Sequence, residues 1–397
     1  MSSPLSCSPM FSRRTDWKLT PNRFTETQRE LTASRREVLD LTVSNPTRIG
    51  LHYEKEAILR SLAQPESLDY DPQPKGLLSA RQAVAGYYRE QHSAFDFDPE
   101  ALILTASTSE AYSYIFRLLC NAQDEVLVPK PSYPLFQFLA DLQDVKLVSY
   151  PLLYDHGWQI DLPSLYKTVN HRTRALVVVH PNNPTGSFVR GDEIAALNGF
   201  CREYNLALIV DEVFLDYPHD GAPRPTFAAN RDALTFTLSG LSKISGLPQM
   251  KVAWLATSGP EDKRGEALAR LEVIADTYLS MSTPVQLATP VLLEQRKSFQ
   301  PLLLDRLRTN REELDRQLEK QTACRRLHVE GGWYAVLWVP VTRSDEELVI
   351  ELLQKHSVVV HPGHFYDFPT DGCLVVSLIT PPQDFREGIS RLLEFLK

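Results

Sequence analysis

The middle of the chain alternates short, continuously apolar runs with longer amphipathic stretches. The apolar runs are four or five residues long, which is typical of strands buried on both faces of a parallel sheet. Residues 110–119 and 192–204, which lie between such runs, have helical patterns. The seven predicted strands are residues 102–105, 125–128, 146–149, 175–179, 206–210, 234–238 and 252–256. The pattern therefore predicts an α/β domain with a mostly parallel, seven-stranded sheet.

The C-terminal part of the chain has a different pattern. Residues 301–321 form a long charged stretch in which leucines recur at near-helical spacing. Strand-like runs follow at 333–339, 358–361 and 374–378, with a helical pattern at 345–356. This order predicts a smaller α+β domain. We divide the chain into an N-terminal segment packing with the small domain (1–50), a large domain (51–290) and a small domain (291–397).

Charge and composition narrow the function classes. The net charge of −8 and the absence of a basic run argue against a nucleic-acid partner. No run of about 18 apolar residues is present to span a membrane, and residues 1–14 lack the apolar core of a signal peptide. The five cysteines are scattered, odd in number and without metal-ligand spacing, which favours free thiols in a reducing compartment. We expect a cytoplasmic protein without a metal site.

Lys243 is the strongest candidate for chemistry. It follows the strand at 234–238 and is surrounded by small and hydroxyl residues. Partial desolvation at such a place lowers the pKa of an amine and exposes its lone pair, so Lys243 is suited to form a Schiff base. Asn183, Asp211 and the Ser107 region also follow predicted strands. Because ligands gather at the carboxyl ends of parallel strands, we expect these residues to converge.

Several short motifs occur in a specific order. They are Tyr70 followed by Gly76-Leu77, Thr105-Ala106-Ser107-Thr108-Ser109-Glu110, Pro131-Ser132-Tyr133-Pro134, Asn183-Pro184-Thr185-Gly186, Asp211-Glu212-Val213 and Ser242-Lys243. With these motifs the chain, from about residue 40 onward, resembles the pyridoxal phosphate (PLP)-dependent aminotransferases of fold type I, in the class I/II group typified by aspartate aminotransferase. The resemblance implies that PLP is the cofactor.

The resemblance also implies how the cofactor ring is held. Lys243 would form the Schiff base with PLP. Asp211 would keep the pyridine nitrogen protonated, so that the ring acts as an electron sink. Asn183 would donate to the phenolate oxygen of the ring, and Tyr133 would stack on its face.

The phosphate of the cofactor would be bound by a second group of residues. Ser107, Thr108 and Ser109 would form a cup whose backbone N–H groups point at the anion, and the hydroxyl of Ser242 would join them. Tyr70 would reach the phosphate from the other subunit, which implies a homodimer.

The chain departs from the family at three places around the ring and phosphate and at one place near the N-terminus. Lys251 stands where the family has a phosphate-binding arginine, so the charge is kept but the bidentate fork is lost. Phe214 replaces a tyrosine that bonds the phenolate, and Gly240 replaces a common phosphate-binding serine. The segment Thr42 to Arg48 lies where the family favours Gly-x-Pro.

The largest departure is Val375, which occupies the place of the arginine that grips the substrate α-carboxylate. Either the substrate lacks that carboxylate or another cation binds it. Asn45 and Arg48 are the candidate substrate-binding residues, because their segment lines the substrate side in this family. His361 and His364 are alternatives that offer only a hydrogen bond when neutral.

Three function classes follow. The first is an aminotransferase that moves an amino group between an amino acid, or an amine, and a 2-oxo acid. The second is a PLP-dependent lyase, decarboxylase or racemase, because the same scaffold supports all of these. The third is a non-enzymatic PLP-binding regulator, which is disfavoured because the sequence shows no helix-turn-helix or appended domain.

Overall fold

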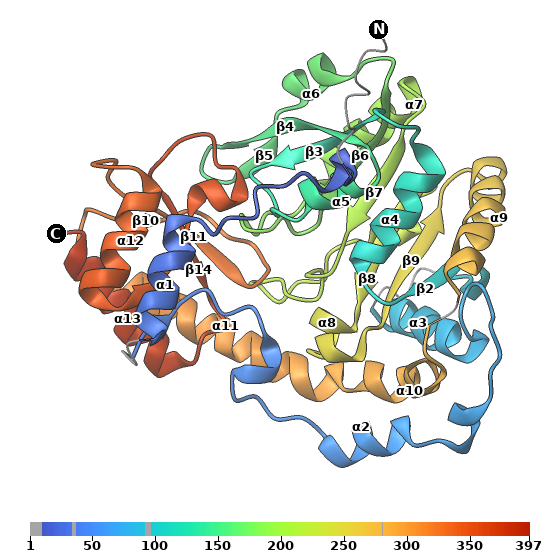
Figure 1. Ribbon diagram of the computed structural model, residues 1–397, viewed down its shortest axis with the longest axis horizontal. Helices are drawn as coiled ribbons and strands as arrows, with labels where there is room; N and C mark the ends of the chain where they lie inside the picture. Colours follow the sequence, from blue (N-terminus) through green and yellow to red (C-terminus); the bar gives the residue numbers. More distant parts are fainter. Residues whose placement is uncertain (1–9, 34–36, 92–96, 280) are drawn as a thin grey trace, which may run out of the picture.

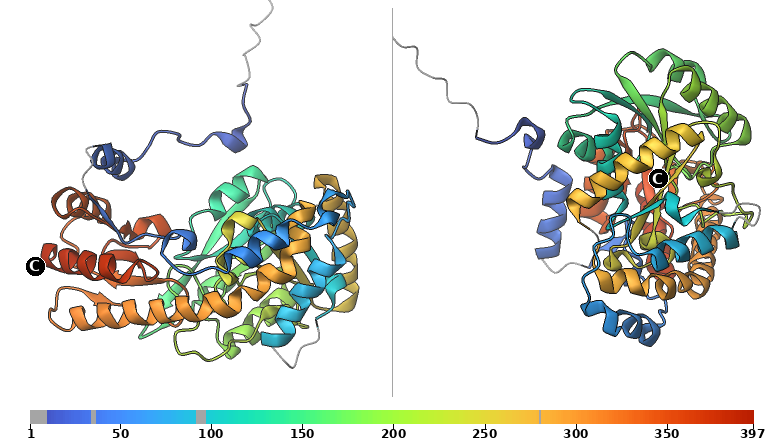
Figure 2. Two further views of the ribbon diagram at one scale, coloured as in Figure 1. Left: turned by 90° about the horizontal axis from the view of Figure 1, so that it is seen from below. Right: turned by 90° about the vertical axis from the view of Figure 1, so that its right-hand side faces the viewer.

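The computed structural model has two main sheets that are connected by one long helix. It describes residues 10–33, 37–91, 97–279 and 281–397. Figure 1 shows the large sheet in turquoise, green and yellow, and the smaller C-terminal sheet in orange to red at the opposite end. Helix α11 (Arg296–Leu318) runs lengthwise from one part to the other, most plainly in the left view of Figure 2. None of the described helices is long and apolar enough to cross a membrane.

The large sheet has eight strands in the order β2-β9-β8-β7-β6-β3-β4-β5. The pairings make β9 and β5 antiparallel to their neighbours, and the other six strands share one direction. The strands are β2 (Leu102–Thr105), β3 (Glu125–Lys130), β4 (Lys146–Tyr154), β5 (Trp158–Ile160), β6 (Thr173–Val179), β7 (Ala207–Asp211), β8 (Thr235–Gly240) and β9 (Ala253–Ser258). The seven predicted strands are confirmed. Sequence analysis missed β5, because this three-residue strand owes its place to a hairpin with β4 rather than to an apolar run.

Helices cover both faces of this sheet, which explains its continuously apolar strands. Val177 packs with α4 and α9 on one face, and Val178 packs with α6 and α7 on the other. Helices α3 and α10 cover β2 and β9 at one end of the sheet, on the same face as α6 and α7. The helices of this part are α2 (Lys55–Leu62), α3 (Leu78–Gln91), α4 (Thr108–Leu119), α5 (Phe136–Leu142), α6 (Leu162–Thr168), α7 (Gly191–Glu203), α8 (Leu241–Ile244), α9 (Glu261–Tyr278) and α10 (Thr283–Glu294).

The small sheet is antiparallel, in the order β10-β11-β14-β13. Its strands are β10 (Arg325–Arg326), β11 (Tyr334–Trp338), β13 (His361–Pro362) and β14 (Cys373–Ser377). A separate parallel pair joins β1 (Leu39–Asp40) to β12 (Val358–Val359), and α1 (Arg23–Ala33) packs on α12 (Asp345–His356). Helix α13 (Pro382–Phe395) packs against α11. The predicted strand at 358–361 is thus divided between two pairings.

Helix α11 begins five residues before its predicted start at Pro301. The prediction rested on the spacing of Leu303, Leu307, Leu314 and Leu318, which lie after Pro301. In the structure Pro301 lies inside the helix. The preceding turn is held by Arg296 and Lys297, which pair with Glu90 of α3 and with Glu294. The pairs with Glu90 join segments that are far apart in sequence, so they are not visible in a local sequence pattern.

Short 3-10 helices complete the description. They are η1 (Arg13–Thr15), η2 (Pro46–Arg48), η3 (Pro65–Leu68), η4 (Pro99–Ala101), η5 (Phe227–Ala229), η6 (Pro248–Met250) and η7 (Gly363–Tyr366). Two of them matter for the site: η2 contains Arg48, and η7 connects β13 to β14.

Candidate active site

Lys243 lies in α8, which begins directly after β8. Its ammonium nitrogen is 4.5 Å from the ring centre of Trp333 and 5.3 Å from that of Phe214. Burial lowers the pKa of Lys243 from 10.5 to about 8, although the Asp211 carboxylate opposes this shift. Near neutral pH, part of the Lys243 population is therefore an uncharged amine with a free lone pair. Such an amine can act as a nucleophile or as a base.

Asp211 ends β7, the strand next to β8. Burial raises its pKa to about 6, against hydrogen bonds from the Val213 N–H (3.2 Å) and the Tyr112 hydroxyl (3.4 Å). The pKa of Tyr133 is raised by burial and then by the Asp211 charge, so Tyr133 also lies close to this carboxylate. At pH 7 Asp211 is a buried anion, and such a group needs a cationic partner.

Asn183 belongs to a turn beside Asp211. The backbone N–H of His180 donates to the Asp211 carbonyl at 2.8 Å, which places the end of β6 against the end of β7. The Asn183 Oδ1 is buried and has no hydrogen-bond partner in the described part of the chain. Gly186 closes the turn with a φ of +71°, and a Cβ there would lie 2.4 Å from the Gly331 carbonyl. Only glycine fits that approach, which fixes Asn183 relative to the loop before β11.

The start of α4 offers backbone donors at the carboxyl end of β2. Ser107 caps the helix by accepting from the Glu110 N–H at 3.2 Å, and the Glu110 carboxylate accepts from the Ala106 N–H at 2.6 Å. Among the described residues, nothing accepts from the N–H groups of Thr108 and Ser109. Two free donors at the positive end of a helix are suited to an anion such as a phosphate.

Ser242 and Lys251 flank the passage from β8 to β9. The Leu241 N–H donates to the Val252 carbonyl at 2.9 Å, so the residues on either side of this bond are close in space. Lys251 is exposed and has a left-handed backbone with a φ of +54°. A Cβ at Gly240 would lie 2.9 Å from the Ala253 Cβ. This contact explains why Gly240 stands where a serine is common, since a larger residue would collide with β9.

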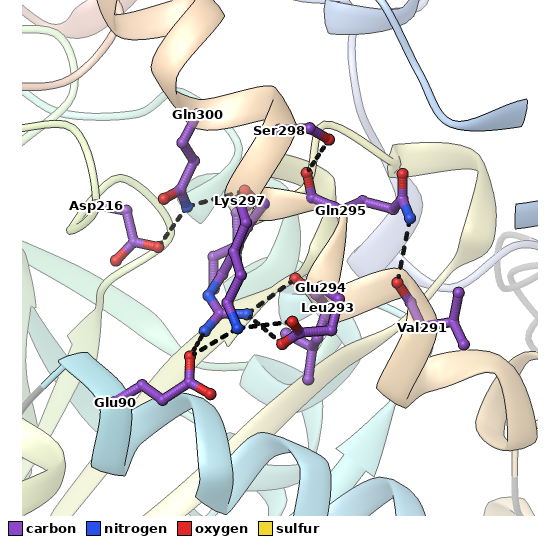
Figure 3. Close-up of polar contacts among 11 residues, drawn as sticks. Glu90, Asp216, Val291, Leu293, Glu294, Gln295, Lys297, Ser298 and Gln300 are labelled. Carbon is purple, nitrogen blue, oxygen red and sulfur yellow. Dashed lines mark hydrogen bonds and ion pairs between the residues drawn. The ribbon is translucent and has the colours of Figure 1, made fainter. Parts of the chain in front are cut away.

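Helix α11 holds the backbone next to Lys243 through Gln300, whose contact with Asp216 is drawn in Figure 3. The Gln300 side chain donates to the Ile244 carbonyl at 3.0 Å and to the Asp216 carboxylate at 2.6 Å. The Tyr217 hydroxyl donates to the Lys243 carbonyl at 2.5 Å. Sequence analysis missed these supports, because they come from distant elements that only the fold brings together.

The segment with Asn45 and Arg48 lies between the small sheet and the Lys243 loop. The Ser377 hydroxyl donates to the Val43 carbonyl at 2.6 Å, and the Tyr53 hydroxyl bridges the carbonyls of Pro46 (3.3 Å) and Gly246 (2.8 Å).

Within that segment, the Asn45 Oδ1 is used locally, because it caps η2 by accepting from the N–H and the hydroxyl of Thr47. The Arg48 side chain is exposed, and no partner for it is found among the described residues.

Tyr70 lies on the surface of the single chain, where its side chain is 75% exposed. Its neighbour Asp69 accepts from the Thr283 hydroxyl at 3.4 Å, which places Tyr70 beside the start of α10. Sequence analysis missed Trp333, Tyr112 and Tyr366, whose positions near the site depend on packing. In the described residues, no cluster of His, Cys, Asp and Glu suited to a metal is present.

The strand ends thus bring an amine and a buried carboxylate together, and a helix start suited to an anion follows a strand of the same sheet. Comparison with known proteins agrees with this. The profile of the family Aminotransferase class I and II matches residues 36–392, and the chain belongs to this family of transaminases. The family assignment favours the aminotransferase over the lyase, decarboxylase, racemase and regulator alternatives.

Individual relatives cover nearly the whole chain. The alanine aminotransferase of Mycobacterium tuberculosis is 28% identical over 375 residues, which is 92% of this chain and 87% of that protein. The glutamate-pyruvate aminotransferase AlaA of Haemophilus influenzae is 27% identical over 91% of both chains. Among solved structures, the alanine aminotransferase of Pyrococcus furiosus superposes with a TM-score of 0.86 at 23% identity, covering 94% of this chain and 95% of that one.

Proposed function

We propose that this aminotransferase uses PLP to move an amino group between an amino acid, or an amine, and a 2-oxo acid. The observation that carries the proposal is the half-buried Lys243 amine beside the buried Asp211 carboxylate. When bound, PLP supplies an electron sink for the electrons of a substrate C–H bond. The residues fit this cofactor: the buried Asp211 carboxylate needs a cation, and the start of α4 offers free N–H donors.

Each of these residues has a defined task in the proposal. Lys243 would hold the cofactor aldehyde covalently and, once released, would move a proton to and from the substrate α-carbon. Asp211 keeps the ring nitrogen protonated. The Asn183 side chain bonds the ring oxygen, and Tyr133 covers the ring face. Thr108 and Ser109 donate to the phosphate, aided by Ser107, Ser242 and Lys251.

The reaction type is tested with an amino donor in the absence of an acceptor. An aminotransferase stops after half a cycle, so one oxo acid should form per active site. A lyase or decarboxylase returns to its starting form and continues to turn over. Product formation well beyond one equivalent would therefore contradict the proposed function.

We also propose a homodimer in which Tyr70 of one subunit serves the phosphate site of the other. Leu59, Leu68 and Tyr70 lie in or near α2 and η3 and are largely exposed, which supports a covered apolar surface. The inactive variants Tyr70→Phe and Lys251→Ala should complement each other when co-expressed. Each mixed dimer regains one intact site, so about one quarter of all sites should be active after random pairing. Mixed dimers without activity would contradict the shared site.

Arg48 is proposed to bind the substrate α-carboxylate, with Asn45 shaping η2 beside it. Arg48→Ala should raise KM about tenfold or more for donors with that carboxylate, because a charge-assisted hydrogen bond is lost. It should spare amines that lack the carboxylate. Arg172→Ala is the matched control, because Arg172 is exposed before β6 at the other end of the sheet. An equal change for both donor types would remove Arg48 from this role.

Two further parts of the proposal concern organisation and location. The chain divides into an N-terminal segment (1–50), a large PLP-binding domain (51–290) and a small domain (291–397). The scattered cysteines support a cytoplasmic location: Cys120, Cys201, Cys324 and Cys373 are free thiols, and Cys7 lies outside the described residues.

A further inference from the structure

Trp333 enters the site from the loop before β11, which is tied to the loop after β7. The Gly332 N–H donates to the Tyr217 carbonyl at 3.0 Å, and a Cβ at Gly331 would lie 2.8 Å from the same oxygen. Gly332 has a φ of +79°, a conformation that favours glycine. The Trp333 carbonyl accepts from the Leu378 N–H at 2.8 Å. The two glycines therefore allow a close approach that fixes the backbone of Trp333 at this junction.

Ring packing sets the orientation of the Trp333 side chain. The indole is fully buried and meets Phe214 at a centroid distance of 5.2 Å and Tyr217 at 5.4 Å, edge-on in both cases. Its Nε1 is buried and has no hydrogen-bond partner in the described part of the chain. Tyr334 meets Phe214 at 6.3 Å, and burial raises the pKa of both Tyr217 and Tyr334, so these phenols stay uncharged.

The Lys243 nitrogen contacts two of these rings. It lies 4.5 Å from the ring centre of Trp333 and 5.3 Å from that of Phe214. Both distances are within the range of a cation–π contact. The two ring planes are inclined at 64°, so the nitrogen has aromatic neighbours in two directions. The Tyr217 hydroxyl, which donates to the Lys243 carbonyl at 2.5 Å, links the packing of Trp333 to the backbone of Lys243.

Asp211 is the charged group that acts on Lys243 in the described part of the chain. Burial lowers the pKa of Lys243, and the Asp211 carboxylate raises it. The neighbouring carboxylates of Glu212 and Asp216 each accept hydrogen bonds from two other donors. A buried ammonium with one carboxylate nearby remains costly, so further contacts that favour its charged form are important.

An aromatic face attracts a cation, and the attraction is stronger where water is excluded. We propose that Trp333, assisted by Phe214, is a positioning residue that stabilises the ammonium form of Lys243 and holds its nitrogen in place. The inference rests on the proposed function, in which Lys243 moves a proton to and from the substrate α-carbon. Lys243 becomes an ammonium when it takes that proton, and the two rings stabilise this form.

The test titrates Lys243 in the cofactor-free protein, so it needs no turnover. Lys243 is half-buried, and acetic anhydride is small enough to reach it. Only the uncharged amine reacts, so trace acetylation at a series of pH values, read by peptide mass spectrometry, gives the pKa. In Trp333→Leu the acid dissociation constant of Lys243 should rise about tenfold, which lowers its pKa. Trp333→Phe keeps an aromatic ring and should restore most of the wild-type value.

The sign of the change separates this role from simple packing. If Trp333 only excludes water, its replacement by leucine admits water to Lys243 and raises the pKa toward its ordinary value. A raised or unchanged pKa in folded Trp333→Leu would therefore overturn the proposal. So would a Trp333→Phe protein that titrates like Trp333→Leu.

A second variant and a control keep the test independent of one substitution. Phe214→Leu should lower the pKa of Lys243 by less than Trp333→Leu, because its ring is farther from the nitrogen. If Trp333→Leu does not fold, Phe214→Leu decides: a pKa that is not lowered would refute the role of the rings. Trp338→Leu is the control, because Trp338 is partly exposed on the same strand and its ring faces Arg325. It should leave Lys243 unchanged, and an equal fall there would also refute the assignment.

The reaction with an amino donor separates this inference from the proposed function. If the pKa of Lys243 falls in Trp333→Leu but no donor yields an oxo acid with the wild type, the proposed function fails and the role of Trp333 stands. If donors yield one oxo acid per site but the pKa does not fall, the proposed function stands and the role of Trp333 fails.

Discussion

Replacing Lys243 by alanine is expected to abolish covalent attachment of PLP and to lower kcat by about 10,000-fold or more. The reason is that one amine performs two tasks, as the anchor of the cofactor and as the base at the substrate α-carbon. Its half-buried place between Trp333 and Phe214 and its pKa of about 8 suit both tasks. Borohydride reduction followed by peptide mass spectrometry measures the attachment, and steady-state kinetics measures the loss of rate.

Lys263→Ala serves as the matched control, because Lys263 lies on the surface helix α9 and donates to Asn205. It should keep both the adduct and the activity. The Lys243→Ala protein should melt at a similar temperature without cofactor, since removing a desolvated amine relieves a cost of burial. A reducible PLP adduct at another lysine, together with full activity in the Lys243 variant, would show that the anchor has been misassigned.

The strand ends could be predicted because they depend on local patterns. Apolar runs define the strands, and parallel strands place Asp211, Asn183 and Lys243 at one edge without any further information. The strand that sequence analysis missed, β5, has three residues and forms through its hairpin partner. The start of α11 was predicted five residues too late, because the ion pairs of Arg296 and Lys297 with Glu90 join segments that are far apart in sequence.

The parts that could not be predicted depend on contacts between distant segments. The ring of Trp333 reaches Lys243 only because the small sheet packs against the large one. The contact of His361 with Tyr366 requires the turn of η7. The hydrogen bond from Gln300 to the Ile244 carbonyl requires α11 to run from the small sheet to the large one. These contacts join elements far apart in sequence, so hydrophobic periodicity carries no signal for them. Tyr70 shows a further limit, because its proposed role needs a second subunit.

Asp211→Asn should have opposite effects on the cofactor-free protein and on the enzyme. Asn cannot balance a protonated ring nitrogen, so PLP should bind more weakly and kcat should fall roughly 100- to 1,000-fold. Without cofactor, however, the wild-type protein carries a buried carboxylate with a raised pKa of about 6. The variant removes this buried charge and should therefore melt at a higher temperature at pH 8.

The pH dependence gives the sign of this effect. The pKa of Asp211 is about 6 in the folded protein and about 3.9 in the unfolded chain, so the folded state binds the proton more tightly. The cofactor-free wild type should therefore gain roughly 3 kcal/mol from this group as the pH falls from above 6 to below about 4, and lose it as the pH rises. Asp211→Asn should lack this contribution, so the two proteins should differ most at pH 8 and least near pH 4. Denaturant unfolding across this range measures the difference.

If the variant is instead less stable than the wild type at pH 8, Asp211 supports the fold through its hydrogen bonds. The loss of activity in the variant would then not report on the ring nitrogen.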